Sequence, residues 1–179
     1  MNIRINIYCT FQTPPSGGSH NNNEVLAIEL EWCGYLNLDS VSCATRVREG
    51  MEQYVGGYWT CAVSTKTPAS GYSRYYAYDS YYDLFGVCGT YHNQDPNAAK
   101  LQIACDSASN YCGNDMVCMR DFVKASHQNG IHDWCPTGGN SEKFNFLIST
   151  TSGSVAWSGY NGEIATSQHA FCTGYCVNK

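Results

Sequence analysis

The chain has 179 residues, a formal net charge of −5 and a pI of about 5.4, and only 14% of its residues are charged. That share is well below the roughly 25% typical of soluble domains. With ten Lys and Arg residues and no basic stretch, the composition argues against a nucleic-acid partner. No apolar run reaches membrane-spanning length, and the first residues lack the apolar core of a signal peptide.

Eleven cysteines are the most informative part of the composition. They include no C-x2-C pair and the chain has no clustered His, so we expect neither a metal site nor a cofactor. Low charge with many Cys, Tyr and Gly is typical of a secreted, disulfide-bonded protein. The cysteines expected in disulfides are Cys9, Cys33, Cys43, Cys61, Cys88, Cys105, Cys118, Cys135, Cys172 and Cys176. Because the count is odd, one Cys is free or links two chains as a dimer.

The predicted elements begin with two strands. Residues 3–9 and 24–33 alternate apolar and polar side chains, which is the period of a half-buried strand. In the second strand, Glu29 and Glu31 fall on the polar face. We interpret them as solvated charges rather than as the paired carboxylates of a glycosidase.

A helix and a group of strands are predicted next. Asp39 or Ser40 is a suitable N-cap, apolar residues then recur at spacings of three and four, and Gly56 ends the helix. Residues 58–65 are predicted as a strand, and residues 72–82 as an aromatic strand or hairpin after a turn at 66–71.

The second part of the chain repeats this mixture of strands and a helix. The predicted elements are strands at 84–91 and 100–105, a helix capped by Asn114 or Asp115 and stopped by Gly130, a hairpin of 144–150 with 154–158, and a last strand with Cys172 and Cys176. Pro96 would also permit a short helix at 100–105.

Residues 43–61 (CATRVREGMEQYVGGYWTC) resemble residues 118–135 (CMRDFVKASHQNGIHDWC). Three pairs share an offset of 75, since 118 − 43 = 122 − 47 = 134 − 59. The same offset relates Leu26, Ile28 and Leu30 to Leu101, Ile103 and Cys105. A fixed offset indicates an internal duplication, although two similar units in a Cys-rich chain could also agree by chance.

The predicted fold is a single compact domain, residues 1–179, with halves of about 1–82 and 83–179. Each half is expected to be a β-β-α-β-β unit, which gives an α+β sandwich of antiparallel sheet with two helices and many disulfides. Cys112, Cys172 and Cys176 have no counterpart in the first half. We expect these cysteines to tie the last strand to the second helix region.

The enzyme hypothesis depends on His127, His132 and Asp133, which lie close to Cys135. Because Cys135 aligns with Cys61 in the repeat, a disulfide explains it better than a nucleophile does. We therefore assign no catalytic residue, and a secreted hydrolase with a His or carboxylate site is kept as an alternative.

The binding hypothesis depends on the tyrosine run. Tyrosine gives a large contact area at small entropic cost, which favours interfaces. The predicted binding residues are Tyr75, Tyr76, Tyr78, Tyr81 and Tyr82. Cross-strand aromatic packing in the core would explain the same run, and a lectin-like or structural module would use the same tyrosine face.

Several short motifs resemble those of a family of small secreted fungal proteins, the killer-toxin-like effectors, which include necrosis-inducing effectors and killer toxins. The motifs are CTFQTPPSGGS at 9–19, GYWTC at 57–61, LFGVCGTY at 84–91 and GNDMVCMRDFVKAS at 113–126. The resemblance implies an α/β sandwich and a secreted toxin or virulence effector that binds a cell-surface or host target, protein or glycan. Residues 40–85 also resemble a dynein-light-chain unit, but that family is cytosolic and lacks disulfides.

Overall fold

The structure is a computed structural model that describes residues 21–65, 68–91, 95–135, 144–150, 154–159 and 162–178. The predicted strand at 3–9 and Cys9 lie outside these residues. The described part of the first half forms α2 (Asn22–Tyr35), α3 (Ser40–Tyr54), β1 (Trp59–Thr65), β2 (Ala69–Tyr72), β3 (Tyr75–Asp79) and β4 (Leu84–Tyr91). The second half forms α4 (Ala98–Cys112), α5 (Met116–Gln128), β5 (Phe144–Thr150), β6 (Ser154–Ser158), β7 (Gly162–Thr166) and β8 (Ala170–Asn178).

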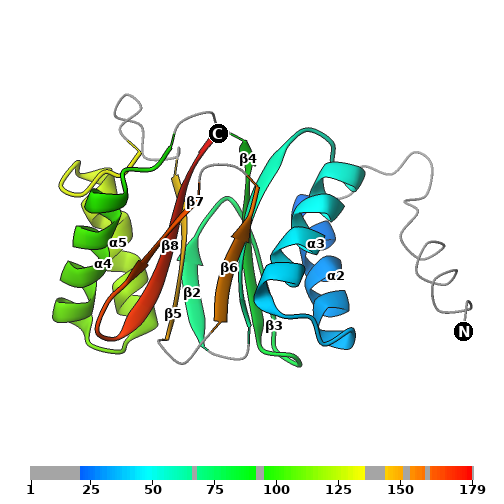
Figure 1. The fold of residues 1–179 in the computed structure, drawn as a ribbon, viewed down its shortest axis with the longest axis horizontal. Helices are drawn as coiled ribbons and strands as arrows, with labels where there is room; N and C mark the ends of the chain where they lie inside the picture. The colour runs from blue at the N-terminus through cyan, green and yellow to red at the C-terminus, as the bar shows by residue number, and fades with distance from the viewer. Residues whose placement is uncertain are drawn as a thin grey trace, which may run out of the picture.

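These elements stack in four layers, with a helix pair on each outer side of two antiparallel sheets (Figure 1). The first sheet has the order β3-β4-β1-β6 and the second β7-β8-β5-β2, and β4 joins β8 at one end. One core cluster lies between α2, α3 and the first sheet, another between α4, α5 and the second. A third cluster, which includes Val87 and Tyr175, lies between the sheets. The α+β class with antiparallel sheets is therefore confirmed, with four described helices in place of the expected two.

Each half contributes one strand, β2 or β6, to the sheet of the other half. β6 pairs with β1, from Cys61 opposite Ser158 to Thr65 opposite Ser154. β2 in turn pairs with β5 of the other half. The predicted hairpin of 144–150 with 154–158 is therefore wrong, although both strands exist, because β8 and β2 occupy the two edges of β5.

Both predicted helices are confirmed, and side-chain caps explain where they begin. Asp39 accepts a hydrogen bond from the backbone N–H of Ser42 at 2.7 Å at the start of α3. Asp115 does the same for Cys118 at 3.0 Å at the start of α5. Such caps satisfy N–H groups that have no partner within the helix.

The strands predicted at 24–33 and 100–105 are wrong, because both segments lie within helices, α2 and α4. Leu26 and Leu30 are fully buried, as a strand or a helix would place them. In a strand, Ile28 would share the buried face of Leu26 and Leu30. It is instead 45% exposed, and its counterpart Ile103 is 49% exposed, which identifies both segments as helices. Glu29, expected in solvent, is only 2% exposed.

The predicted β-β-α-β-β unit is also wrong, because the order that recurs is α-α-β-β-β-β. β4 pairs with β1 and β3, so the first set of elements ends with β4 and not at residue 82. In the second helices the buried faces correspond at an offset of 76. Cys43, Val47 and Met51 match Met119, Val123 and His127, since 119 − 43 = 123 − 47 = 127 − 51. A common origin by duplication stays a prediction.

Ten of the eleven cysteines form five disulfides, and each disulfide lies within one half. The pairs are Cys33–Cys43, Cys61–Cys88, Cys105–Cys172, Cys112–Cys118 and Cys135–Cys176. Cys176 ties β8 to the segment after α5, as expected, whereas Cys172 ties β8 to α4. The expectation was wrong for Cys112, which does not reach β8. Cys112, omitted from the predicted disulfides, is the partner of Cys118. A disulfide-linked dimer would therefore have to use Cys9, which lies outside the described residues.

Candidate functional site: a tyrosine surface

The tyrosine run does not form one strand. Tyr75, Tyr76 and Tyr78 lie on β3, whereas Tyr81 and Tyr82 lie in the turn that joins β3 to β4. On β3, Tyr76 and Tyr78 lie opposite Val87 and Phe85 and are each 57% exposed. Tyr81 is 85% exposed. The structure therefore leaves three of the five predicted binding residues available to a partner.

The other two tyrosines, Tyr75 and Tyr82, pack against the protein core and against α2. Tyr75 is half-buried against Trp59, with ring centroids 5.4 Å apart. Tyr82 is half-buried against α2, where a Cβ added at Gly34 would overlap its ring. For these two side chains, the alternative of aromatic core packing holds.

A residue from α2 adds to the exposed group. Tyr35 is 63% exposed and stands edge-on to Trp32, with ring centroids 5.4 Å apart. Sequence reasoning missed Tyr35 because it treated the segment as a strand that ended at Cys33. We name Tyr35, Tyr76, Tyr78 and Tyr81 the tyrosine surface. Tyr35 lies on the α2 side of the first sheet, whereas Tyr76 and Tyr78 project from its other face, as Val87 and Phe85 do.

Polar contacts fix the β3–β4 turn. The carboxylate of Asp79 accepts hydrogen bonds from the backbone N–H groups of Tyr81 and Tyr82, at 2.9 and 3.0 Å. The phenol of Tyr78 donates to Asp83 at 3.0 Å, and Asp83 has a positive φ of 56°. A turn held in this way presents its rings at low entropic cost on binding.

The electrostatics show which groups are neighbours. Partial burial raises the pKa of Tyr82, followed in size by the effects of Tyr81, Asp79, Glu31 and Tyr35. The hydrogen bond to Asp83 raises the pKa of Tyr78. The phenols of Tyr78 and Tyr82 therefore remain protonated at physiological pH, and that of Tyr78 is engaged by Asp83.

The catalytic candidates are not brought together with a nucleophile. Cys135 is bonded to Cys176, so it carries no thiol. His127 is 7% exposed, stacks on Phe144 with centroids 3.7 Å apart and accepts a hydrogen bond from the N–H of Cys135 at 3.3 Å. Burial lowers the pKa of His127 to about 4. This ring acts as part of the core.

Asp133 is engaged as well, in an ion pair of 2.9 Å with Lys100 that lowers its pKa. His132 is half-buried beside it. This ion pair ties the segment after α5 to α4 and gives Asp133 a structural partner.

Glu29 is the buried charge that sequence reasoning placed in solvent. Its carboxylate lies 3.0 Å from Nε of Arg46. Desolvation raises the pKa of Glu29 to about 7, in opposition to the Arg46 charge. Its stem crosses α3 at Gly50, where an added Cβ would lie 2.6 Å from Cγ of Glu29. The sequence signal for this contact is a Glu in one helix and a Gly in the next, because the Gly leaves room for the Glu side chain.

Comparison with protein-family models, curated proteins and solved structures finds no match to this chain. The killer-toxin-like and dynein-light-chain resemblances therefore stay predictions. Among the described helices, none is long and apolar enough to cross a bilayer.

Proposed function

We propose that this protein is a secreted toxin or virulence effector that acts by binding a cell-surface or host molecule through the tyrosine surface. The observation that carries the proposal is the exposure of Tyr35 on α2, Tyr76 and Tyr78 on β3, and Tyr81 in the β3–β4 turn, which lies between 57% and 85%. Hydrogen bonds to Asp79 fix that turn. Large aromatic side chains held open to solvent in this way are typical of binding surfaces.

The disulfides support the extracellular part of the proposal. Five bridges in the described residues fit a protein that folds in an oxidising compartment. They also suit a protein that must survive outside the cell, because each bridge restricts the unfolded chain.

Serine substitution of the whole surface tests the proposal. The variant Y35S/Y76S/Y78S/Y81S should lose at least tenfold in binding of labelled protein to target cells, and should lose killing or leaf necrosis, with an unchanged melting temperature. Tyr58 and Tyr111, 66% and 76% exposed elsewhere, provide the matched control Y58S/Y111S, which should bind normally. Equal binding by the quadruple variant would refute the proposal. A glycan-array signal that depends on the same tyrosines would instead assign the lectin-like class.

Peptide capture by strand addition is a second candidate, favoured by the two exchanged strands. β2 and β6 are each the last strand of their sheet among the described strands, and they lie against α5 and α3. An extended peptide can add to such an edge through main-chain hydrogen bonds. Hydrogen exchange separates the candidates, because a partner on β6 protects amides 154–158, whereas a partner on the tyrosine surface does not.

A further inference from the structure

A pocket of about 410 Å³ lies beside the junction of the two sheets. The segment from β2 to β3 forms one wall with Tyr72, Ser73, Arg74 and Tyr75, and β5 contributes Phe144 and Asn145. This volume is within the range of small-molecule sites, which combine apolar walls with a few polar groups. The pocket has both, and it is not part of the tyrosine surface.

The walls are aromatic. The rings of Tyr72 and Phe144 have centroids 5.2 Å apart, and Tyr72 also stacks on Phe146 at 6.2 Å. Tyr75 is held against Trp59 on its other side. Tyr72 and Tyr75 pack against the two core clusters and are only half-buried, so they are held in place with surface left for a flat apolar group, whereas the Phe144 ring is fully buried.

Among the described residues, Arg74 is the one charged side chain that lines the pocket. Six Lys and Arg side chains fall within the described residues, and four of them, Arg46, Arg48, Lys100 and Arg120, form ion pairs with carboxylates. Arg74 and Lys124 form none in that part of the chain. They lie instead over the rings of Tyr75 and Tyr72, at 5.5 and 4.7 Å. Arg74 therefore lines the pocket itself, and Lys124 lies over the ring of Tyr72, which is one of the lining residues.

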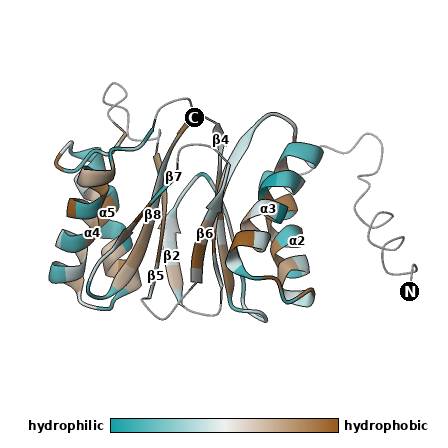
Figure 2. Ribbon diagram, viewed as in Figure 1, coloured by the Kyte–Doolittle hydropathy of each residue, from teal (hydrophilic) through white to brown (hydrophobic). Residues whose placement is uncertain are grey.

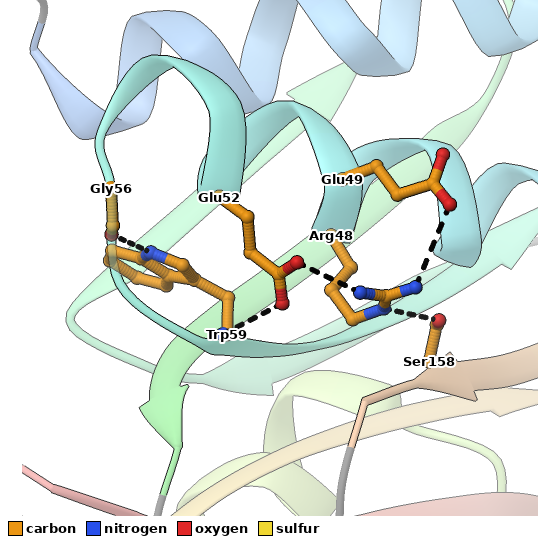
Figure 3. A network of polar contacts seen from close by, with 6 residues as sticks. All are labelled: Arg48, Glu49, Glu52, Gly56, Trp59 and Ser158. Carbon is orange, nitrogen blue, oxygen red and sulfur yellow. Dashed lines mark hydrogen bonds and ion pairs between the residues drawn. The ribbon is translucent and has the colours of Figure 1, made fainter.

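The residue that corresponds to Lys124 in the first half is neutralised by carboxylates, whereas Lys124 is not, within the part of the chain that the structure describes. At the offset of 76, Lys124 corresponds to Arg48, which donates to Ser158 at 2.8 Å and pairs with Glu52 at 3.0 Å and Glu49 at 3.7 Å (Figure 3). The same offset places Ala125 and Gln128 where Glu49 and Glu52 stand. The second half therefore keeps the cation and lacks the carboxylates that would neutralise it.

We propose that this pocket binds a small aromatic carboxylate. The aromatic ring lies between Tyr72 and Tyr75, and the carboxylate accepts hydrogen bonds from the guanidinium of Arg74. An Arg–carboxylate contact beside apolar walls is directional and stronger than the same contact in open water. Lys124 adds positive potential at Tyr72. Because the whole chain carries a net charge of −5, local charge must attract the ligand, so raising the salt concentration weakens binding.

Calorimetric titration with 2-naphthylacetate tests the ring and the charge separately. Neutral 2-naphthylacetamide keeps the ring without the charge, and acetate keeps the charge without the ring. Saturable 1:1 binding of 2-naphthylacetate, at least tenfold tighter than either control, is expected. No saturable binding of 2-naphthylacetate, or equal binding of the amide, overturns the proposal.

Variants then locate the site. Arg74→Gln should weaken 2-naphthylacetate binding at least tenfold, and Lys124→Gln by a smaller factor. Arg48→Gln changes the corresponding cation in the first half and should leave binding unchanged. Circular dichroism shows whether each variant is folded. Should Arg74→Gln fail to fold, Arg74→Lys is used, since it keeps the charge and loses the fork of donors. Full binding by a folded Arg74 variant assigns the ligand elsewhere and overturns the proposal.

Discussion

Glu29 and His127 are buried groups whose protonation affects stability in opposite directions. The first lies between α2 and α3, and the second lies in the core between α5 and the second sheet. Burial favours the neutral form of each. For Glu29 this means keeping a proton, and for His127 it means losing one.

Glu29 should make the protein less stable as the pH rises. Its pKa of about 7 in the folded protein exceeds its ordinary value of 4.5, so the folded state holds the proton more tightly. The stability is present below pH 4.5 and is lost as the pH rises to about 7, by about 3 kcal/mol. Glu29→Gln should remove this contribution, so between pH 4.5 and 7 the stability of the variant should rise with pH relative to that of the wild type. Urea unfolding at several pH values, with the disulfides intact, measures it, and parallel curves for the variant and the wild type would contradict it.

His127 should have the reverse effect. Its pKa of about 4 lies below the ordinary 6.5, so its stabilisation is present above pH 6.5 and is lost as the pH falls to about 4, by about 3 kcal/mol. Between pH 4.5 and 6.5 the two groups offset each other. His127→Gln should therefore uncover the decline due to Glu29 in the same unfolding series. Half-buried His132 provides the control His132→Gln, and an equal change in that variant would argue against the assignment.

At the scale of elements, the contact between α2 and the β3–β4 turn supports the tyrosine surface. Gly34→Ala should destabilise the protein by about 1–3 kcal/mol, because the new Cβ would overlap the ring of Tyr82. Helix propensity alone predicts the opposite sign, a gain of about 1 kcal/mol. Chemical denaturation distinguishes the two signs. Gly34→Ala combined with Tyr82→Ala should recover part of the loss attributed to the clash, and no recovery would show that the contact is not the cause.

Elements with strong local signals could be predicted from the sequence. The caps Asp39 and Asp115 and the three- and four-residue period identify α3 and α5. The apolar run from Trp59 identifies β1. α2 and α4 were missed, because Leu26 and Leu30 fit both a strand and a helix, and only tertiary packing shows that Ile28 is exposed.

The pairing of strands that are far apart in the sequence could not be predicted from local sequence patterns. Residues 144–150 and 154–158 are adjacent in sequence and have hairpin composition, yet β5 and β6 pair with β2 and β1. The candidate site shows the same division. Tyrosine composition indicated the region, but the roles of Tyr75 and Tyr82 as anchors and the addition of Tyr35 depend on how α2 packs on β3.

At the scale of the whole molecule, the strand exchange makes the halves dependent on each other. A fragment of residues 21–91 would contain α2 to β4 and both of its disulfides, but β1 would lack β6 and β2 would lack β5. We expect two such fragments to exchange β2 and form a dimer. Size-exclusion chromatography with light scattering should give twice the fragment mass. A folded monomer would show that the exchange is dispensable.

The outer helices carry hydrophobic as well as hydrophilic residues, which the ribbon coloured by hydropathy shows in brown and teal (Figure 2). Ile28, Tyr35 and Val41 are exposed on the first helix pair, by 45% to 63%. Ile103, Tyr111 and Val117 are exposed on the second by 49% to 76%. Each group thus has one Ile, one Tyr and one Val, and Tyr35 in the first group is also part of the tyrosine surface.

Because no disulfide among the described cysteines joins the two halves, the peptide between β4 and α4 is their only covalent link in that part of the chain. A protease that cut there would create a two-chain protein held by β-sheet hydrogen bonds and the core between the sheets. Its dissociation would follow mass action, so dilution would favour separation. Each released chain would carry an unpaired strand edge, and such edges pair with other chains. Proteolysis at a single bond would thus convert a durable disulfide-bonded protein into one whose lifetime depends on its concentration.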